Sequence, residues 1–130
     1  MPELRFQVTV EGTDTAGDYN SPSPSRDSGK VVIASVDRIN ERIEYLGAGE
    51  SLTLDSAVLR GGVTAPEFVA IHADNNVLVG RTAGAEEWSL KKDGWMVVGP
   101  LTTCSTIRVA DDGVATTADK TKVLIIIGGD

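Results

Sequence analysis

The fold of this chain is decided by one stretch, Phe68 to Val98, which reads FVAIHADNNVLVGRTAGAEEWSLKKDGWMVV. Short apolar runs alternate in it with polar breaks rich in Asn, Asp, Gly and Lys, and such breaks favour turns. The pattern predicts four short strands, at residues 68–71, 77–80, 86–90 and 95–98, joined by three turns. Turns about ten residues apart are typical of an antiparallel β-sandwich or jelly roll. We therefore expect an all-β protein.

The rest of the chain continues this pattern on both sides. Apolar runs predict further strands at residues 4–10, 30–37, 51–59, 104–109 and 122–127. The last of these is so apolar that we expect it to be covered on both faces. Residues 38–46 fit two structures. Ile39, Ile43 and Leu46 have the spacing of a helix face. Ile39, Ile43 and Tyr45 also share one face of a strand, and the surrounding strands favour this second structure.

A polar segment interrupts the strands near the N-terminus. Residues 11–29, EGTDTAGDYNSPSPSRDSG, show no apolar periodicity and are dense in Gly, Pro, Ser and Asp. Such a composition does not bury enough apolar surface to order itself alone, and structureless loops of this length are uncommon inside compact domains. We divide the chain into an N-terminal strand with an extended arm (1–29) and a β-sandwich domain (30–130). The arm lies either on a neighbouring chain or on the edge of the sandwich; a plain surface loop is the alternative.

Composition excludes several classes of partner. Twelve Lys and Arg against 19 Asp and Glu give a net charge of −7, the opposite of the basic surface that nucleic acid requires. The apolar run Val123 to Ile127 is far shorter than the roughly 20 residues of a membrane helix. The N-terminus lacks the pattern of a secretory signal, so we expect synthesis in the cytoplasm. The single cysteine, Cys104, allows no internal disulfide or thiolate cluster, and we expect it to be a buried or half-buried apolar residue.

No motif predicts catalysis or a cofactor. Nucleophilic catalysis needs a nucleophile, a nearby base and a group that orients the base. The chain has one histidine, His72, beside a predicted turn, and one cysteine, Cys104, so at most one catalytic site centred on a histidine could be built. We therefore predict that the protein is not an enzyme and that it holds no cofactor or metal. Acidic loops could supply oxygen ligands to calcium, but their spacing matches no EF-hand pattern, and Asp is common in turns because its side chain bonds the local backbone. The acidic residues concerned are Asp14, Asp18, Asp111, Asp112 and Asp119.

Two tryptophans are candidates for contacts with a partner. Trp88 and Trp95 lie across one predicted hairpin, and tryptophan is concentrated at binding hot spots. Together with Tyr45 they could instead form a platform for sugars, so a carbohydrate-binding module is an alternative function. The full set of interface candidates is Tyr19, Pro22, Pro24 and Arg26 on the arm, with Trp88 and Trp95 on the sandwich.

Three segments resemble one family. They are AIHADNNVLVG at residues 70–80, EWSLKKDGW at 87–95 and the apolar VLIII at 123–127. Together they resemble the small β-sandwich, jelly-roll-like structural proteins of tailed bacteriophage virions, over about residues 66–130. In that group a strand ends in a short Asn/Asp turn, an apolar strand ending near Gly follows, and the chain closes on an apolar strand.

The resemblance implies a structural role in a virion. The expected protein is a capsid decoration (cement) protein, made in the host cytoplasm, that stabilises the shell by binding the major capsid protein and its own copies. It is expected to be a homo-oligomer, with a trimer as the implied number. A component of the tail, of the head-to-tail connection or of a fibre base is the alternative place in the virion.

Overall fold

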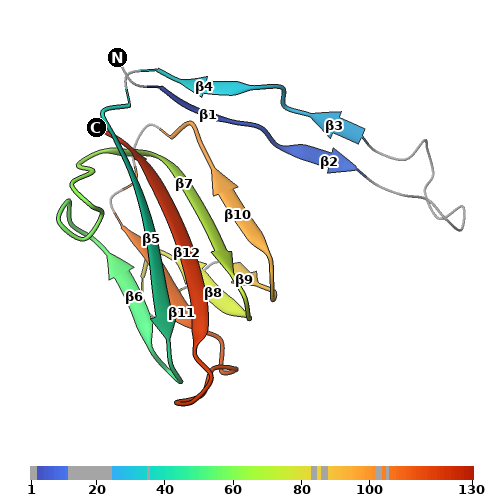
Figure 1. Cartoon of the computed structure of the whole chain (residues 1–130), viewed down its shortest axis with the longest axis vertical. Helices are drawn as coiled ribbons and strands as arrows, with labels where there is room; N and C mark the ends of the chain where they lie inside the picture. Colours follow the sequence, from blue (N-terminus) through green and yellow to red (C-terminus); the bar gives the residue numbers. More distant parts are fainter. Residues whose placement is uncertain are drawn as a thin grey trace, which may run out of the picture.

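A computed structural model describes residues 3–11, 25–34, 36–82, 85, 88–101, 104 and 106–130 of the chain. Within these residues the regular structure is entirely β (Figure 1). The strands are β1 (Leu4–Phe6), β2 (Thr9–Glu11), β3 (Ser25–Asp27), β4 (Val31–Ile33), β5 (Arg38–Leu46), β6 (Ser51–Leu54), β7 (Pro66–Ala73), β8 (Val77–Gly80), β9 (Trp88–Leu90), β10 (Trp95–Val98), β11 (Ile107–Asp111) and β12 (Thr121–Gly129).

Strands β5 to β12 form two four-stranded antiparallel sheets that pack face to face. The first sheet has the order β10-β7-β12-β5 and the second the order β6-β11-β8-β9. Every connection except that between β8 and β9 carries the chain from one sheet to the other. Eight antiparallel strands wound in this way over two sheets form a jelly roll. The predicted all-β sandwich is confirmed.

The main core lies between the two sheets and follows from the alternation of side chains along each strand. In β12, Val123, Ile125 and Ile127 point inward and are almost completely buried. They meet Val79 of β8 and Val109 of β11 from the opposite sheet, in one continuous apolar cluster. Each such side chain contributes roughly 1.5–3 kcal/mol when fully buried, so β-branched residues supply a core that contains few aromatic rings.

Two sequence predictions about connections are wrong. The strand predicted for residues 51–59 ends at Leu54, because a series of turns follows it and Gly61 and Gly62 both have positive φ. Trp88 and Trp95 do not share a hairpin: β9 pairs with β8 and β10 with β7, so the turn between them crosses from one sheet to the other. Residues 38–46, for which a helix was the alternative, form the nine-residue strand β5.

The N-terminal strands form a separate two-stranded ribbon. Strand β1 pairs with β4 (Leu4 opposite Ile33), and β2 pairs with β3 (Thr9 opposite Asp27). The two parts are joined at Val8 and Ser28, where the Ser28 N–H donates to the Val8 carbonyl at 2.9 Å and the Val8 N–H donates to the Ser28 hydroxyl at 2.9 Å. Strand β4 thus belongs to the ribbon and not to either sheet of the sandwich, as Figure 1 shows.

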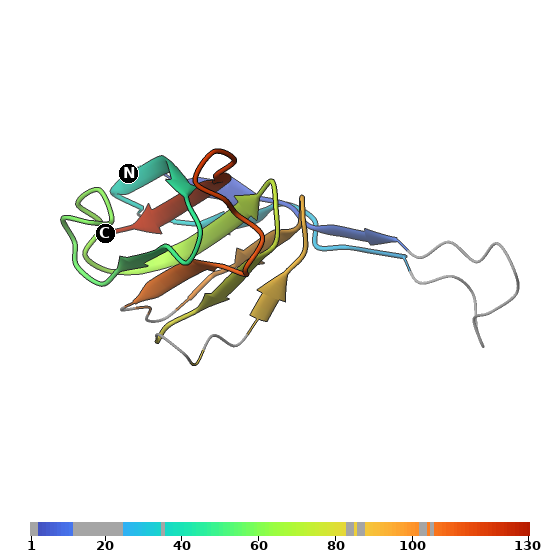
Figure 2. The same ribbon diagram turned by 90° about the horizontal axis from the view of Figure 1, so that it is seen from below.

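A second, smaller core fixes the base of this ribbon to the sandwich. Leu4 and Ile33 are buried against Val36, Phe68 and Ala70, on the outer face of the first sheet. Phe6 adds an aromatic contact, with its ring centroid 4.9 Å from that of Phe68. An isolated two-stranded ribbon is marginally stable in water, so this core holds the ribbon in its direction. Beyond the core, β2 and β3 extend past the body of the sandwich (Figures 1 and 2).

Candidate interaction surface

The outer face of the first sheet carries a row of apolar and aromatic side chains. The strand register places Ile43, Leu124, His72 and Trp95 side by side across β5, β12, β7 and β10. The next row on the same face ends in Val97. Ile43 is 47% exposed, Trp95 55% and Val97 39%, whereas Leu124 and His72 are partly buried. Contiguous apolar patches of this kind on a soluble protein mark interaction sites.

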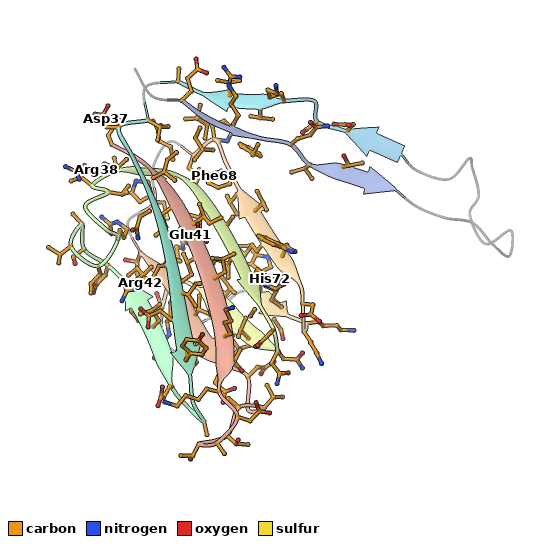
Figure 3. The ribbon with its side chains drawn as sticks, viewed as in Figure 1. Asp37, Arg38, Glu41, Arg42, Phe68 and His72 are labelled. Atoms are coloured by element: carbon orange, nitrogen blue, oxygen red, sulfur yellow. The ribbon has the colours of Figure 1, made fainter. Side chains whose placement is uncertain are left out.

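Strand β5 extends this patch to the edge of the sheet. Its odd-numbered residues face outward, and Ile39 and Tyr45 are 56% and 57% exposed. We call the combined surface of Ile39, Ile43, Tyr45, His72, Trp95, Val97 and Leu124 the outer patch. Two charged residues, Glu41 and Lys122, lie among them on the same face. The base of the ribbon covers the end of this face at Phe68, Ala70 and Ile126 and lies away from His72, which is on the outer patch (Figure 3).

The polar side of β5 explains why its apolar side faces solvent. The Arg42 Nε atom lies 2.5 Å from a Glu44 carboxylate oxygen, and Arg42 Nη1 donates to the Leu59 carbonyl at 2.7 Å. The Asn40 side chain packs so closely on Gly61 that a Cβ there would overlap its carboxamide. Since these contacts satisfy the even-numbered residues on the inner side, the strand cannot turn over without leaving charges unpaired. The isoleucine side chains of β5, Ile39 and Ile43, therefore face solvent.

The structure separates the two tryptophans. Trp95 lies on the outer patch, and its ring centroid is 4.7 Å from that of His72, with a tilt of 38°. Trp88 is opposite Val79 and therefore points to the inner side of the second sheet, at the open edge of the sandwich. Tyr45 shares a face with Trp95 but lies on the opposite edge strand. The three rings do not form the single sugar platform that the sequence left open.

His72 has no catalytic surroundings in the described part of the chain. It borders a shallow hollow on the outer face together with Glu41, Asp74, Lys122 and two apolar residues. The lining contains no hydroxyl or thiol that His72 could activate, although a His-based nucleophilic site requires one. The Asp74 carboxylate accepts the backbone N–H of Lys122 at 2.8 Å and so has a structural role in the turn.

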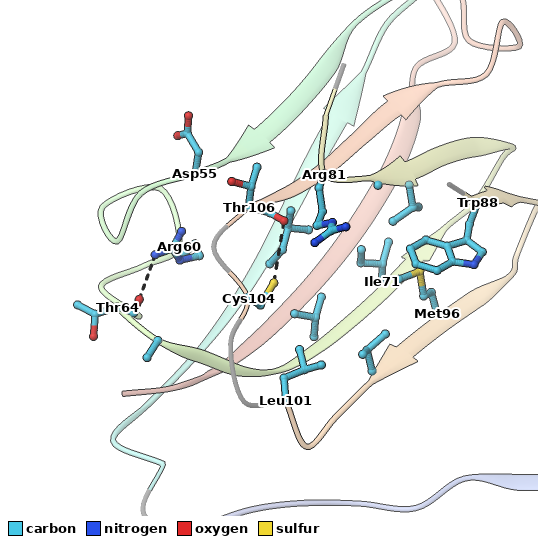
Figure 4. A pocket seen from close by; sticks show the side chains of 16 residues that line it. Asp55, Arg60, Thr64, Ile71, Arg81, Trp88, Met96, Leu101, Cys104 and Thr106 are labelled. Carbon is cyan, nitrogen blue, oxygen red and sulfur yellow. Dashed lines mark hydrogen bonds between the residues drawn. The ribbon is translucent and has the colours of Figure 1, made fainter. Parts of the chain in front are cut away.

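A second hollow opens between the two sheets beside Trp88 (Figure 4). Its inner wall includes core residues such as Ile71, which is completely buried, and partly buried residues such as Met96 and Leu101 line the rest. Arg60 lies at its rim, where its guanidinium donates to the carbonyls of Val63 at 3.0 Å and Thr64 at 3.2 Å. These hydrogen bonds join Arg60 to the end of the 55–64 connection and so stabilise its conformation.

Cys104 lies in the wall of this second hollow and is partly buried, as the sequence predicted. Burial raises the pKa of its thiol, and the positive charges of Arg60 and Arg81 offset only part of this effect. Its Sγ is 4.0 Å from the Thr106 carbonyl. A raised pKa reduces the thiolate fraction at neutral pH, which agrees with the packing role that the sequence predicts for Cys104.

The acidic turns are held by the protein itself. Asp112 accepts the Ser89 hydroxyl at 3.0 Å, and the Asp119 N–H donates to the Thr116 hydroxyl at 2.8 Å. In the ranges that the structure describes, no three His, Cys, Asp or Glu side chains are grouped as metal ligands. Asp14 and Asp18, the other acidic pair considered for calcium, lie outside the described residues.

Asp111 connects two turns through backbone donors. Burial by itself would raise the pKa of its carboxyl, but N–H groups of Ala115 (3.0 Å), Gly49 (3.1 Å), Val114 (3.3 Å) and Gly113 outweigh burial and hold the pKa below its usual value. Because the pKa of Asp111 is lower in the folded state, the ionised carboxylate stabilises the protein at pH values above the pKa that Asp111 has in the unfolded chain. This stabilisation disappears as the pH falls through the pKa of Asp111 in the folded protein.

We expect Asp111→Asn to lower the free energy of unfolding by about 1–2 kcal/mol at pH 7, because the amide nitrogen faces N–H donors that the carboxylate accepted. Urea unfolding at pH 7 and at about pH 2 measures this, since the difference from the wild type should shrink once Asp111 is protonated. An equal difference at both pH values would show that the carboxylate charge is not responsible.

The remaining interface candidates lie on the arm. Tyr19, Pro22 and Pro24 are outside the described residues. Arg26 belongs to β3, opposite Val10, and only its backbone is described. The structure therefore brings together Trp95, Tyr45 and His72 on one face, and the exposed isoleucines of β5 join them. Sequence reasoning missed Ile39 and Ile43 as surface residues, because apolar side chains at alternate positions normally mark the buried face of a strand.

The fold and this surface define a jelly-roll sandwich with a projecting ribbon and an uncovered apolar sheet face. Comparison with family models, with curated proteins and with solved structures finds no match to the chain. Among the described residues no helix is long and apolar enough to cross a membrane.

Proposed function

We propose that this chain is a non-enzymatic structural protein of a tailed-bacteriophage virion. In this proposal it is a capsid decoration (cement) protein, which stabilises the shell by binding the major capsid protein and its own copies. The sequence resemblance over residues 66–130 is the origin of the proposal. Jelly rolls also serve as lectin and enzyme scaffolds, so the fold alone does not select this role.

The observation that supports the proposal most strongly is the ribbon. A projecting two-stranded ribbon exposes backbone donors and acceptors along both of its edges, and it is marginally stable alone. Here the second core of Leu4, Phe6 and Phe68 keeps the base in place while β2 and β3 extend past the sandwich. Such an element is suited to lie on a neighbouring subunit, where its edges and side chains gain partners.

The surface chemistry agrees with a protein that binds proteins. The outer patch presents Ile39, Ile43, Tyr45 and Trp95 to solvent, and exposed aromatic and branched side chains supply most of the energy of protein contacts. A net charge of −7 is unfavourable for contact with packaged nucleic acid. We propose that the partners are other virion proteins and further copies of this chain, with a trimer as the number that the resemblance implies.

Cosedimentation tests this proposal. The purified full chain is mixed with shells of its virion that lack it, and separately with purified tails. Saturable binding to shells, and a higher temperature of shell disruption when the protein is bound, is the expected result. Binding to tails alone would replace the decoration role with the tail alternative, and binding to neither would overturn the proposal.

A further inference from the structure

We infer that β5 is an interface between two copies of this chain, in which the free edges of the two β5 strands pair antiparallel about a two-fold axis at Ile43. The pairing joins the two first sheets into one continuous eight-stranded sheet and makes the outer patches of both copies continuous. This inference deepens the self-association in the proposed function by naming its surface, and it can be tested without any virion.

The first argument is the position and length of β5. It is the edge strand of the first sheet and, with β12, one of the two longest strands in the described chain, at nine residues. Its whole length pairs with β12 on one side, and no backbone hydrogen bond among the described residues reaches its other edge. A long edge with unpaired N–H and C=O groups is a template for another strand.

The second argument is that β5 is not protected in the way that edge strands of monomers are. Its outward side exposes Ile39, Ile43 and Tyr45 to about half of their full area, while Arg42 and Glu44 are turned inward. Pairing with a second β5 places Ile43 beside its counterpart and brings the partner's strand alongside Ile39 and Tyr45, so that all three lose exposed area. The described contacts of the 55–62 connection with β5 are made by side chains on the inner side of the strand, Arg42 with the Leu59 carbonyl and Asn40 with Gly61.

The third argument is charge complementarity, which selects a second copy as the partner and also fixes the register. With Ile43 opposite the partner's Ile43, Arg42 lies opposite the partner's Glu44 and the reverse pair repeats across the axis. Glu41 then lies opposite the partner's Tyr45, whose hydroxyl can donate to the carboxylate. Each neighbouring two-fold register places like charges opposite one another. A register centred on residue 40 places Arg38 opposite the partner's Arg42. Registers centred on residues 41, 42 and 44 place Glu41, Arg42 and Glu44, each in turn, opposite the same residue of the partner.

The symmetry has a definite consequence for assembly. A two-fold contact of this kind is isologous and closes after two copies. It therefore produces a dimer of the free protein, and it would connect two trimers if a three-fold contact forms elsewhere on the sandwich.

Sedimentation velocity of the full chain over a range of concentrations tests the dimer. We expect a reversible monomer–dimer equilibrium that Ile43→Lys weakens at least about tenfold, because it places two ammonium groups at the axis. Val32→Lys is the matched control, since Val32 is 46% exposed on β4, which belongs to the ribbon and not to the first sheet, and the change should leave the equilibrium unchanged. A wild-type chain that stays monomeric at every concentration, or forms only trimers, would overturn the inference.

Cysteine crosslinking tests the register. In a Cys104→Ser background, Ile43→Cys places two thiols directly opposite at the axis, within the reach of a disulfide. Ile39→Cys is the control, because position 39 lies opposite the partner's Gly47 and not opposite itself. Rapid oxidation to a covalent dimer at position 43 alone is expected. Equal crosslinking at both positions, or none at position 43, would reject this register. Neither result depends on shell binding, so failure here and failure of the decoration role are distinguishable.

Discussion

Replacing residues 9–27 with an Asn-Gly turn is expected to abolish binding to virion shells while leaving the sandwich folded. Val8 and Ser28 already face each other through two hydrogen bonds of 2.9 Å, so a two-residue turn can join them. The shortened chain keeps Leu4, Phe6 and Ile33, which make up the ribbon side of the second core. The change therefore removes the projecting part of the ribbon and little else.

Two measurements on this variant separate function from folding. Its thermal midpoint should stay within a few degrees of the wild type, whereas cosedimentation with shells should fall to background. Deletion of residues 1–29 is the informative comparison, because it also removes Leu4 and Phe6 and should cost about 3 kcal/mol or more of stability. Undiminished shell binding by the shortened chain would show that the ribbon is not the attachment element.

Gly129→Ala is expected to be among the most damaging single substitutions in the protein. The register between β12 and β7 shifts between Gly128 and Gly129, where Gly129 pairs with Pro66. A Cβ at Gly129 would overlap the Ala65 carbonyl oxygen and would lie 2.9 Å from the carbonyl carbon, and both atoms belong to the backbone. Because no side chain can move aside, the two strands must separate locally, at a cost of about 3 kcal/mol.

Equilibrium unfolding in urea measures this cost, and Gly49→Ala is a suitable control. Gly49 has a φ of 71°, but a methyl group added there would have no atom within 4 Å, so the control should cost only the left-handed backbone penalty of about 1 kcal/mol. If the two substitutions were equally tolerated, the close approach of β12 to Ala65 would be wrong.

Much of the fold could be predicted because the strand signals are local. The runs at Val77 to Gly80 and Trp95 to Val98 form strands at those positions, and the apolar run near residue 125 forms the central strand β12. Strand partners could not be predicted, since a polar turn such as Lys91 to Gly94 looks the same whether it closes a hairpin or crosses between sheets. Here the turn crosses between the two sheets, and Asp93 within it adopts a φ of 61°.

The candidate site could be predicted only in part, for a similar reason. Trp95 is a candidate by its residue type alone, and the structure places it on an exposed face. The exposure of Ile39 and Ile43 runs against the usual rule, because apolar side chains normally mark the buried side of a strand. The polar side chains of β5 face inward because they contact the 55–62 connection. Arg42 donates to the Leu59 carbonyl, and Asn40 packs on Gly61. Sequence periodicity contains no information about such contacts.

The position of β12 has a consequence for the kinetics of folding. This strand lies between β5 and β7 in the first sheet, so two strands made much earlier have no partner between them until residues 121–129 have left the ribosome. Nearly all strand pairing is then non-local, and proteins of such topology fold in milliseconds to seconds rather than microseconds. During translation β5 lacks its sheet partner, and β7 can pair only with β10 until β12 has been made. Unpaired strand edges of this kind make a nascent chain prone to aggregation.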